Sequence, residues 1–367
     1  MNKLKSFFSI FFIFFFLIFF SYIFVVILID PYDIFHQTKF EKINNKKYFH
    51  LEREYVHKEI NLLRNNPNIL LLGSSSSLIG FELHNYKNFK NKKVYNFGLS
   101  GVGPYEMNLY MSELIHNLDN LEKVIIGLDF FMFHNERVIR PQFYEFDYTN
   151  KFMNVFKLGR IILTKSCAKD TFLTLYNNMS DKAVSNEITF YGNLKSDLVY
   201  NSLLSKYGSN EEIFINFLKS DFNASKNSLQ NYNISDKELQ NLDKLIKLLE
   251  ENNIRYDLFL APVHNIYLES LMKIGKRDEI IFLKEKLANF DKFHDFMNYS
   301  ILTDEIISDS MNLYIDPVHF YPIVGNEILD NIFKKSSFKK KQDLDLEKRY
   351  LWLENDSVSS KIINKIF

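Results

Sequence analysis

The stretch Asn68-Ile69-Leu70-Leu71-Leu72-Gly73-Ser74-Ser75-Ser76 decides how this 367-residue chain folds. A short, unbroken apolar run is typical of a strand buried on both faces, and the glycine and serines after it mark a tight turn. Strands of that kind belong to parallel sheets that helices cover on both sides. Ligands bind at the carboxyl ends of such strands, so the serines stand where a site is expected.

Strand and helix patterns alternate along the rest of the chain. Pro104 opens one helical pattern, and Ser235 with Glu238 forms a capping box ahead of another. This alternation is typical of an α/β protein with a parallel sheet. Four further runs are predicted as strands, at 94–97, 124–128, 256–260 and 312–315.

The segment Asp316-Pro317-Val318-His319 adds catalytic chemistry to this frame. An aspartate three residues before a histidine can hold one imidazole nitrogen and leave the other to take a proton from a serine. In a parallel sheet, the last predicted strand carries this segment to the same edge as Ser75. We therefore predict Ser75 as nucleophile, His319 as its base and Asp316 as the group that orients the base. The alternatives are a turn serine and a histidine that caps or packs at the last helix.

The N-terminus carries an uncharged apolar stretch at 7–29. It can cross the ~30 Å hydrocarbon core of a bilayer at ~1.5 Å per residue. It exceeds the roughly 7–15 apolar residues of a cleavable signal and has no small-residue exit site, so we predict a transmembrane signal anchor. Lys3 and Lys5 precede it, which places residues 1–6 in the cytoplasm and the remainder outside.

Composition divides the rest of the chain into three parts. We predict a connector at 30–66, an α/β domain at 67–333 and a tail at 334–367. The tail is interpreted as a solvated or peripherally docked helix rather than a membrane-surface one. Within the domain, 134–233 lacks a sustained period and is predicted to be an insertion or cap. Three aromatic residues in it are expected to pack rather than to stack on sugar rings: Tyr144, Phe146 and Tyr148.

Composition and spacing also exclude several classes of function. Lys and Arg number 45, as do Asp and Glu, so no global field favours a nucleic acid. The single cysteine, Cys167, excludes an internal disulfide and a cysteine-rich metal site. The glycine-rich stretches lack the endings or spacings of P-loop and dinucleotide motifs. We therefore predict no metal and no cofactor.

The motifs resemble those of the SGNH or GDSL-type hydrolase family over most of the chain after the anchor. Gly73-Ser74-Ser75 corresponds to the family's Gly-Asp-Ser block, the segment Asn96 to Gly101 to its glycine block, and Asp316 to His319 to its Asp-x-x-His block. The resemblance implies a three-layer, flavodoxin-like parallel sheet. It also implies that the Ser75 and Gly101 N–H groups bind the oxyanion.

Three positions depart from the family's blocks or lie outside them. The family's Gly-x-Asn-Asp block supplies an asparagine donor to the oxyanion, whereas Asp129 stands at that position here. A carboxylate would repel the oxyanion, so Asp129 is expected to be protonated, to serve elsewhere, or to weaken the site. Ser74 replaces the family's aspartate, as in anchored bacterial members. His264 follows a strand end and is either a substrate contact or a structural histidine.

The membrane-anchored bacterial branch of this family resembles the proteins of polysaccharide O-acetylation and teichoic-acid D-alanylation. The resemblance implies a serine esterase or O-acyltransferase for acyl esters, by expectation acetyl, of envelope or exported polysaccharide. Its domain would lie on the extracytoplasmic side of the bacterial cytoplasmic membrane, with a membrane-bound O-acyltransferase as partner. The alternative is a catalytically silent scaffold or glycan-binding partner of that acyltransferase.

Overall fold

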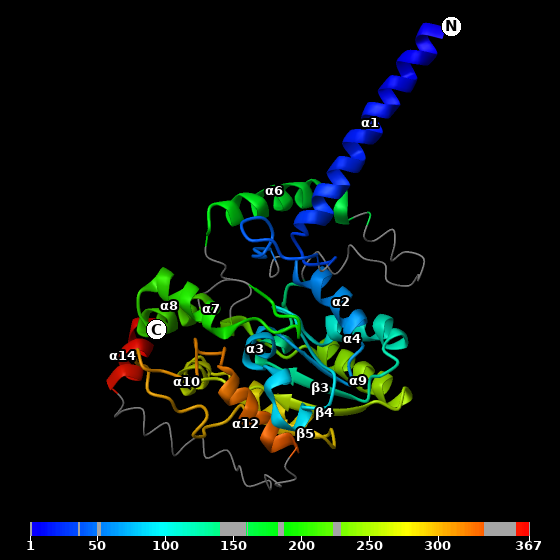
Figure 1. The fold of residues 1–367 in the computed structure, drawn as a ribbon. Helices are drawn as coiled ribbons and strands as arrows, with labels where there is room; N and C mark the ends of the chain where they lie inside the picture. The colour runs from blue at the N-terminus through cyan, green and yellow to red at the C-terminus, as the bar shows by residue number, and fades with distance from the viewer. Residues whose placement is uncertain are drawn as a thin grey trace. The chain divides into compact units, whose positions relative to one another are not determined.

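The computed structural model describes residues 2–35, 37–49, 53–139, 159, 161–182, 187–222, 229–333 and 357–366. The chain forms two compact units (Figure 1), one made of 1–60 with 146–187 and the other of 61–145 with 188–367. The stretch 134–233, predicted as an insertion, is therefore divided between the two units. Tyr144, Phe146, Tyr148 and the tail from 334 to 356 lie outside the described residues.

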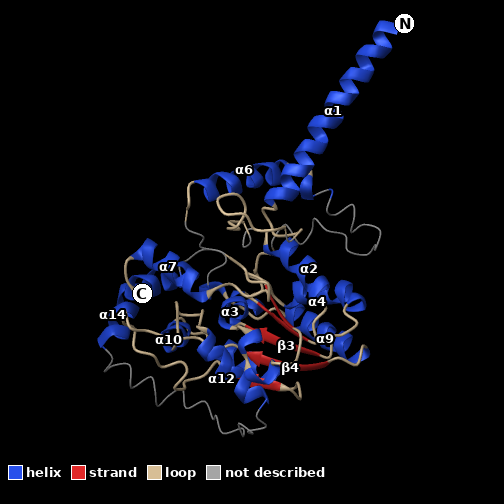
Figure 2. Cartoon of the chain, viewed as in Figure 1, coloured by secondary structure: helices blue, strands red, loops and turns tan. Residues whose placement is uncertain are grey.

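The larger unit is built on a five-stranded sheet whose pairings are all parallel (Figure 2). The order β2-β1-β3-β4-β5 is that of flavodoxin-like doubly wound sheets. The predicted α/β class with a parallel sheet is thus confirmed. The strands are β1 Ile69–Gly73, β2 Val94–Gly98, β3 Lys123–Leu128, β4 Arg255–Leu260 and β5 Phe293–Asp295.

The burial of apolar side chains explains why the central strands could be predicted from the sequence. Every residue of β1 is buried, and β3 is buried from Val124 onward. Burying a large aliphatic side chain stabilises a fold by about 1.5–3 kcal/mol, so a run of them commits the segment to the interior. Helices must then cover both faces of the sheet.

The prediction of a strand at 312–315 is wrong. Tyr314 makes only an isolated antiparallel bridge, to Phe320. The N–H groups of Asn312, Leu313 and Tyr314 donate to the Glu305 carboxylate at 2.7–3.1 Å instead of to a neighbouring strand. The fifth strand is β5, which the sequence did not reveal because its three residues are only partly buried.

The chain passes outward from β1 to β2 and then back past β1 to β3. Right-handed crossovers in opposite directions place their helices on opposite faces, here α3 (Ser75–Gly80) and α4 (Pro104–Leu114). Accordingly, α4 packs on α9 (Asp236–Glu251) and α3 packs on α12 (Pro322–Phe333). Among the described residues, the other α-helices of this unit are α7 Ser196–Tyr207, α8 Asn210–Phe222, α10 Asn265–Lys273, α11 Arg277–Leu287 and α14 Ser357–Ile366, while α2 Glu54–Asn65 crosses the unit boundary.

The predicted start of α9 is confirmed in part. The Ser235 hydroxyl accepts from the Glu238 N–H at 3.3 Å, as an N-cap does. The Glu238 carboxylate does not complete the box, because it accepts from the Tyr105 N–H and from Arg137 instead. The described end of the tail, α14, packs on α8, as a peripherally docked helix would.

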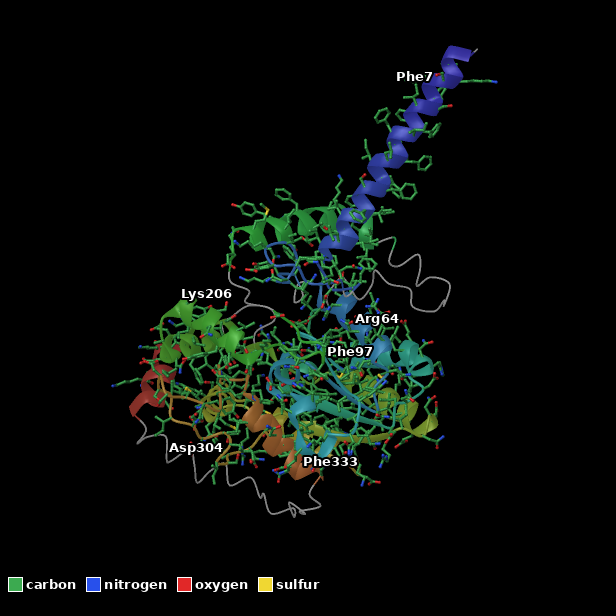
Figure 3. All side chains as sticks on the ribbon, viewed as in Figure 1. Phe7, Arg64, Phe97, Lys206, Asp304 and Phe333 are labelled. Atoms are coloured by element: carbon green, nitrogen blue, oxygen red, sulfur yellow. The ribbon has the colours of Figure 1, made fainter. Side chains whose placement is uncertain are left out.

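The smaller unit contains α1 (Asn2–Ile29) and α6 (Lys165–Met179), which lie against each other. Residues Leu4–Ile29 form a helix long and apolar enough to cross a membrane, with a mean hydropathy of 3.1. Side chains of its N-terminal half, Phe7 among them, stand clear of other elements (Figure 3).

Candidate active site

The nucleophile candidate stands on the turn between β1 and α3. The Ser74 hydroxyl caps α3 by accepting from the Ser76 N–H, which makes Ser75 the first helical residue. The turn leaves no room for a side chain at Gly73, where a Cβ would lie 2.0 Å from the Ser77 Oγ. Because the chain turns so tightly after Gly73, Ser75 lies at the carboxyl edge of the sheet. Ser75 is partly exposed, whereas its serine neighbours are buried.

The structure brings Ser75, His319 and Asp316 together. The His319 Nε2 lies 2.8 Å from the Ser75 Oγ, and its Nδ1 lies 2.6 Å from the Asp316 Oδ2. The other carboxylate oxygen of Asp316 accepts from the N–H groups of Val318 and His319, both at 2.9 Å. The turn after Ile315 therefore fixes the orientation of the Asp316 carboxylate independently of its contact with the imidazole.

The partners assign the imidazole tautomer. An ionised carboxylate only accepts, so the Nδ1 of His319 must carry the proton that points at Asp316. In the neutral ring, Nε2 is then the acceptor, and it faces the Ser75 hydroxyl. This is the arrangement in which a serine can lose its proton to a histidine.

Carboxylates near His319 favour its protonated form. Its side chain is 15% exposed, and the ring of Phe217 packs edge-on against it. Burial alone would lower the imidazole pKa, but Asp316, and further away Asp129 and Asp221, outweigh that effect and raise the pKa. An imidazolium at His319 would therefore be stabilised by these carboxylates.

Asp129 follows β3 directly and binds the serine side chains on both sides of Ser75. Its carboxylate accepts from the Ser74 hydroxyl at 2.5 Å and from the Ser76 hydroxyl at 2.6 Å. Burial raises its pKa, while these two hydrogen bonds and His319 act in the opposite direction. The structure thus places Asp129 as an acceptor that fixes the serine turn.

Gly101 follows β2 in a left-handed conformation, with φ at 70°. That conformation favours glycine. Its carbonyl accepts from the Arg137 Nη1 at 3.2 Å. Arg137 itself lines the cleft that contains Ser75, so the loop of Gly101 borders the site through this side chain.

His264 is buried away from the cleft lining and acts as a helix cap. Its Nδ1 accepts from the Ile266 N–H at 3.2 Å, and its Nε2 lies 2.6 Å from the Glu305 carbonyl. The rings of Phe214 and Tyr314 pack edge-on against the imidazole. With both ring nitrogens engaged by protein groups, the geometry matches the structural alternative rather than a substrate contact.

A cleft of about 350 Å³ opens over Ser75 and His319. Three of its polar residues had no signal in the sequence: Arg137, Asp221 and Tyr267. The Tyr267 hydroxyl donates to the Asp221 carboxylate at 3.1 Å, and burial raises the pKa of Asp221 to about 6. Asp221 comes from α8, in the stretch that showed no period.

Arg137 is held in place rather than free to bind a ligand carboxylate. Its guanidinium makes two hydrogen bonds to Glu106, at 2.6 and 2.8 Å, and one to Glu238 at 3.0 Å. Two carboxylates against one guanidinium leave this wall of the cleft without excess positive charge. Within the described residues, no three His, Cys, Asp or Glu side chains are grouped as a metal site would need.

Comparisons with known proteins add little to this geometry. No family model and no curated protein matches the chain. Among solved structures, one similar chain comes from Streptococcus pneumonia, and its description as a platelet activating factor is itself provisional. The two share 14% identity over 77% of this chain and 92% of that one, with a TM-score of 0.32. So remote a likeness carries no conclusion about fold or activity.

Proposed function

We propose that this protein is a membrane-anchored serine esterase or O-acyltransferase with the fold of the SGNH hydrolases. The observation that carries the proposal is the hydrogen-bonded series from Ser75 through His319 to Asp316. The sheet order and the position of Ser75 at the end of β1 are consistent with that family. The blocks that resemble the family's motifs supply the three members in the expected order.

The proposed reaction begins with attack of the Ser75 Oγ on the carbonyl carbon of an acyl ester. The Ser75 proton passes to the Nε2 of His319, and Asp316 stabilises the resulting imidazolium through Nδ1–H. The N–H groups of Ser75 and Gly101 are proposed to bind the tetrahedral oxyanion. When the carbon–oxygen bond to the alcohol breaks, His319 returns the proton to the departing oxygen. An acyl group on Ser75 remains.

The second half of the reaction reverses these roles. A hydroxyl group enters the cleft and gives its proton to His319 as its oxygen attacks the acyl carbonyl. The Ser75 oxygen then leaves and takes the proton back. Water as acceptor gives hydrolysis, and a sugar hydroxyl gives acyl transfer.

A glycan is proposed as the alcohol component of the ester. A second cleft supports the proposal that this glycan is negatively charged. This cleft, of about 340 Å³, is lined by Arg64, Lys90 and Lys93, together with a stack of His84 on Tyr191 whose ring centroids are 4.0 Å apart. Cations complement uronate or phosphate groups, and ring faces accept sugars. It borders the start of β2, whereas Ser75 follows the end of β1. The two clefts are therefore separated by about the length of a five-residue strand, roughly 16 Å.

The proposed location is the extracytoplasmic face of the bacterial cytoplasmic membrane. It is supported by the apolar helix at Leu4–Ile29 and by the basic residues Lys3 and Lys5 at the N-terminal end of that helix. A membrane-bound O-acyltransferase that supplies the acyl group remains the proposed partner of a transferase.

A fluorophosphonate probe tests the proposal on the full chain in detergent. An activated Ser75 Oγ forms a bond to phosphorus and releases fluoride. We expect labelling of the wild type and none of Ser75→Ala or His319→Ala. Ser77→Ala is the matched control, because it removes a buried hydroxyl that has no hydrogen-bond partner in the described structure.

The outcomes separate the two candidate functions. Labelling of the wild type and of Ser77→Ala alone would support an activated serine at position 75. If the folded wild type takes no label, the catalytically silent scaffold becomes the better description. Labelling that survives Ser75→Ala would place the nucleophile elsewhere.

A further inference from the structure

The helix α6 exposes large apolar side chains and buries polar ones, which is the reverse of what is expected for a helix on a water-exposed surface. Its outward-facing apolar residues are Phe172, Tyr176 and Met179, which are 66%, 53% and 65% exposed, and Leu163 just before the helix is 55% exposed. We call these four residues the outer face. The face turned into the protein is polar, and consists of Cys167, Asp170, Thr171, Thr174 and Asn178.

Specific hydrogen bonds hold α6 in this orientation. The Tyr32 hydroxyl donates to Asp170 at 2.6 Å, and the Asn178 amide donates to the Lys46 carbonyl at 3.0 Å. Rolling the helix to bury its apolar residues would break these buried contacts, and each orphaned polar group costs about 1–3 kcal/mol. The outer face therefore stays outward, and in water it would be an unfavourable apolar patch.

The position of α6 along α1 indicates the level at which that face lies relative to the apolar helix. The Tyr22 hydroxyl donates to the Ile162 carbonyl at 2.5 Å, so α6 begins at the level of residue 22 of the apolar helix. The large apolar side chains of α1 up to Ile18 are exposed, and protein begins to cover the helix only beyond them. A span of ~20 residues that starts at Ser6, after the last charge, ends near Val25. The start of α6 therefore lies level with the edge of the hydrocarbon region.

We propose that the outer face of α6 lies in the membrane–water interface beside the anchor. This inference rests on the proposed insertion of α1. Apolar side chains of an interfacial helix enter the boundary between headgroups and acyl chains, and tyrosines favour that level. Lys165 and Lys169, exposed in the first half of α6, would meet lipid phosphates. The smaller unit would then be attached to the bilayer by a crossing helix and a surface helix.

Single-tryptophan fluorescence tests this proposal on the full chain in vesicles of phosphatidylcholine and phosphatidylglycerol. The chain has one tryptophan, Trp352, which is first replaced by Phe. A tryptophan is then placed at Phe172 or, for comparison, at Phe24 on α1 and at Phe282 in the larger unit. All three aromatic residues are exposed, so Phe→Trp preserves the fold.

Lipids brominated near the glycerol and aqueous iodide report the two environments. We expect Phe172→Trp to lose emission to brominated lipid, as Phe24→Trp does, and to resist iodide. Phe282→Trp should show the converse. Tyr176→Trp repeats the measurement at a second position of the outer face.

Two results would overturn the inference. Quenching of Phe172→Trp by iodide alone, while brominated lipid quenches Phe24→Trp, would show the outer face in water. Protection of Phe172→Trp from both quenchers would mean that protein, such as a second copy of the chain, covers it. A Phe24→Trp that brominated lipid does not quench would instead refute the membrane anchor.

Discussion

Replacing Asp316 with Asn should abolish most activity without disturbing the fold. One oxygen of Asp316 accepts from two backbone N–H groups at 2.9 Å, and the Oδ1 of asparagine can keep both. The amide NH2 then occupies the position 2.6 Å from the His319 Nδ1. Two donors cannot face each other there, so the imidazole moves its proton to Nε2. That nitrogen then donates to Ser75 and can no longer accept its proton.

The size of the loss follows from the role of the tautomer. The same exchange in a serine–histidine–aspartate site lowers kcat by about 10⁴, which corresponds to about 5 kcal/mol of transition-state stabilisation. Asp316 is also the strongest of the carboxylates that raise the pKa of His319. The residual activity of the variant should therefore persist to lower pH, because the base stays neutral there.

Hydrolysis of 4-nitrophenyl acetate across a pH series measures both effects, with circular dichroism to check the fold. The wild type should lose kcat/KM as the pH falls through the raised pKa of His319. If Asp316→Asn kept kcat within about tenfold of the wild type, with an unshifted acid limb, Asp316 would not orient the base. Ser77→Ala again serves as the control that should change neither quantity.

Two further variants, one single and one double, probe the clefts. Asp221→Asn should lower the pKa of the His319 imidazole and move the acid limb of the pH–rate profile to lower pH; an unshifted limb would contradict this. It should also not lower the melting temperature at pH 8, because a carboxyl whose pKa burial raises to about 6 weakens the folded state when it is ionised above that pH. Lys90→Glu with Lys93→Glu should weaken binding of an oligogalacturonate by about tenfold and leave 4-nitrophenyl acetate hydrolysis unchanged. The same reversal at Lys244 and Lys247, both exposed on α9, is the control, and equal loss in both pairs would mean that only net charge matters.

Local features of the sequence predicted four of the five strands and the proposed catalytic residues. The strand β1 is an apolar run that ends in a tight turn, and neither signal depends on the rest of the fold. Asp316 and His319 meet across three residues, so their spacing alone suggested a contact. The meeting with Ser75, 244 residues away, was predicted from a parallel strand at 312–315, whereas the structure brings His319 to Ser75 on a non-strand segment whose N–H groups bind Glu305.

Side-chain contacts that no local pattern encodes explain what the sequence did not predict. The stretch at 312–315 has the composition of a strand, but the Glu305 carboxylate takes up its N–H groups. Glu238 has the spacing of a capping box, yet its carboxylate accepts a hydrogen bond from Arg137, which is 101 residues away. Asp221 gains its raised pKa from burial beside Tyr267, which no local pattern encodes.

Asp129 is placed to act on two parts of the proposed site. Its carboxylate lies directly after β3, where the Ser74 and Ser76 hydroxyls bind it. Those hydrogen bonds spread its charge, and the charge raises the pKa of His319. A carboxylate in that position opposes the oxyanion but favours the imidazolium, so its net effect depends on which charge lies nearer in the transition state.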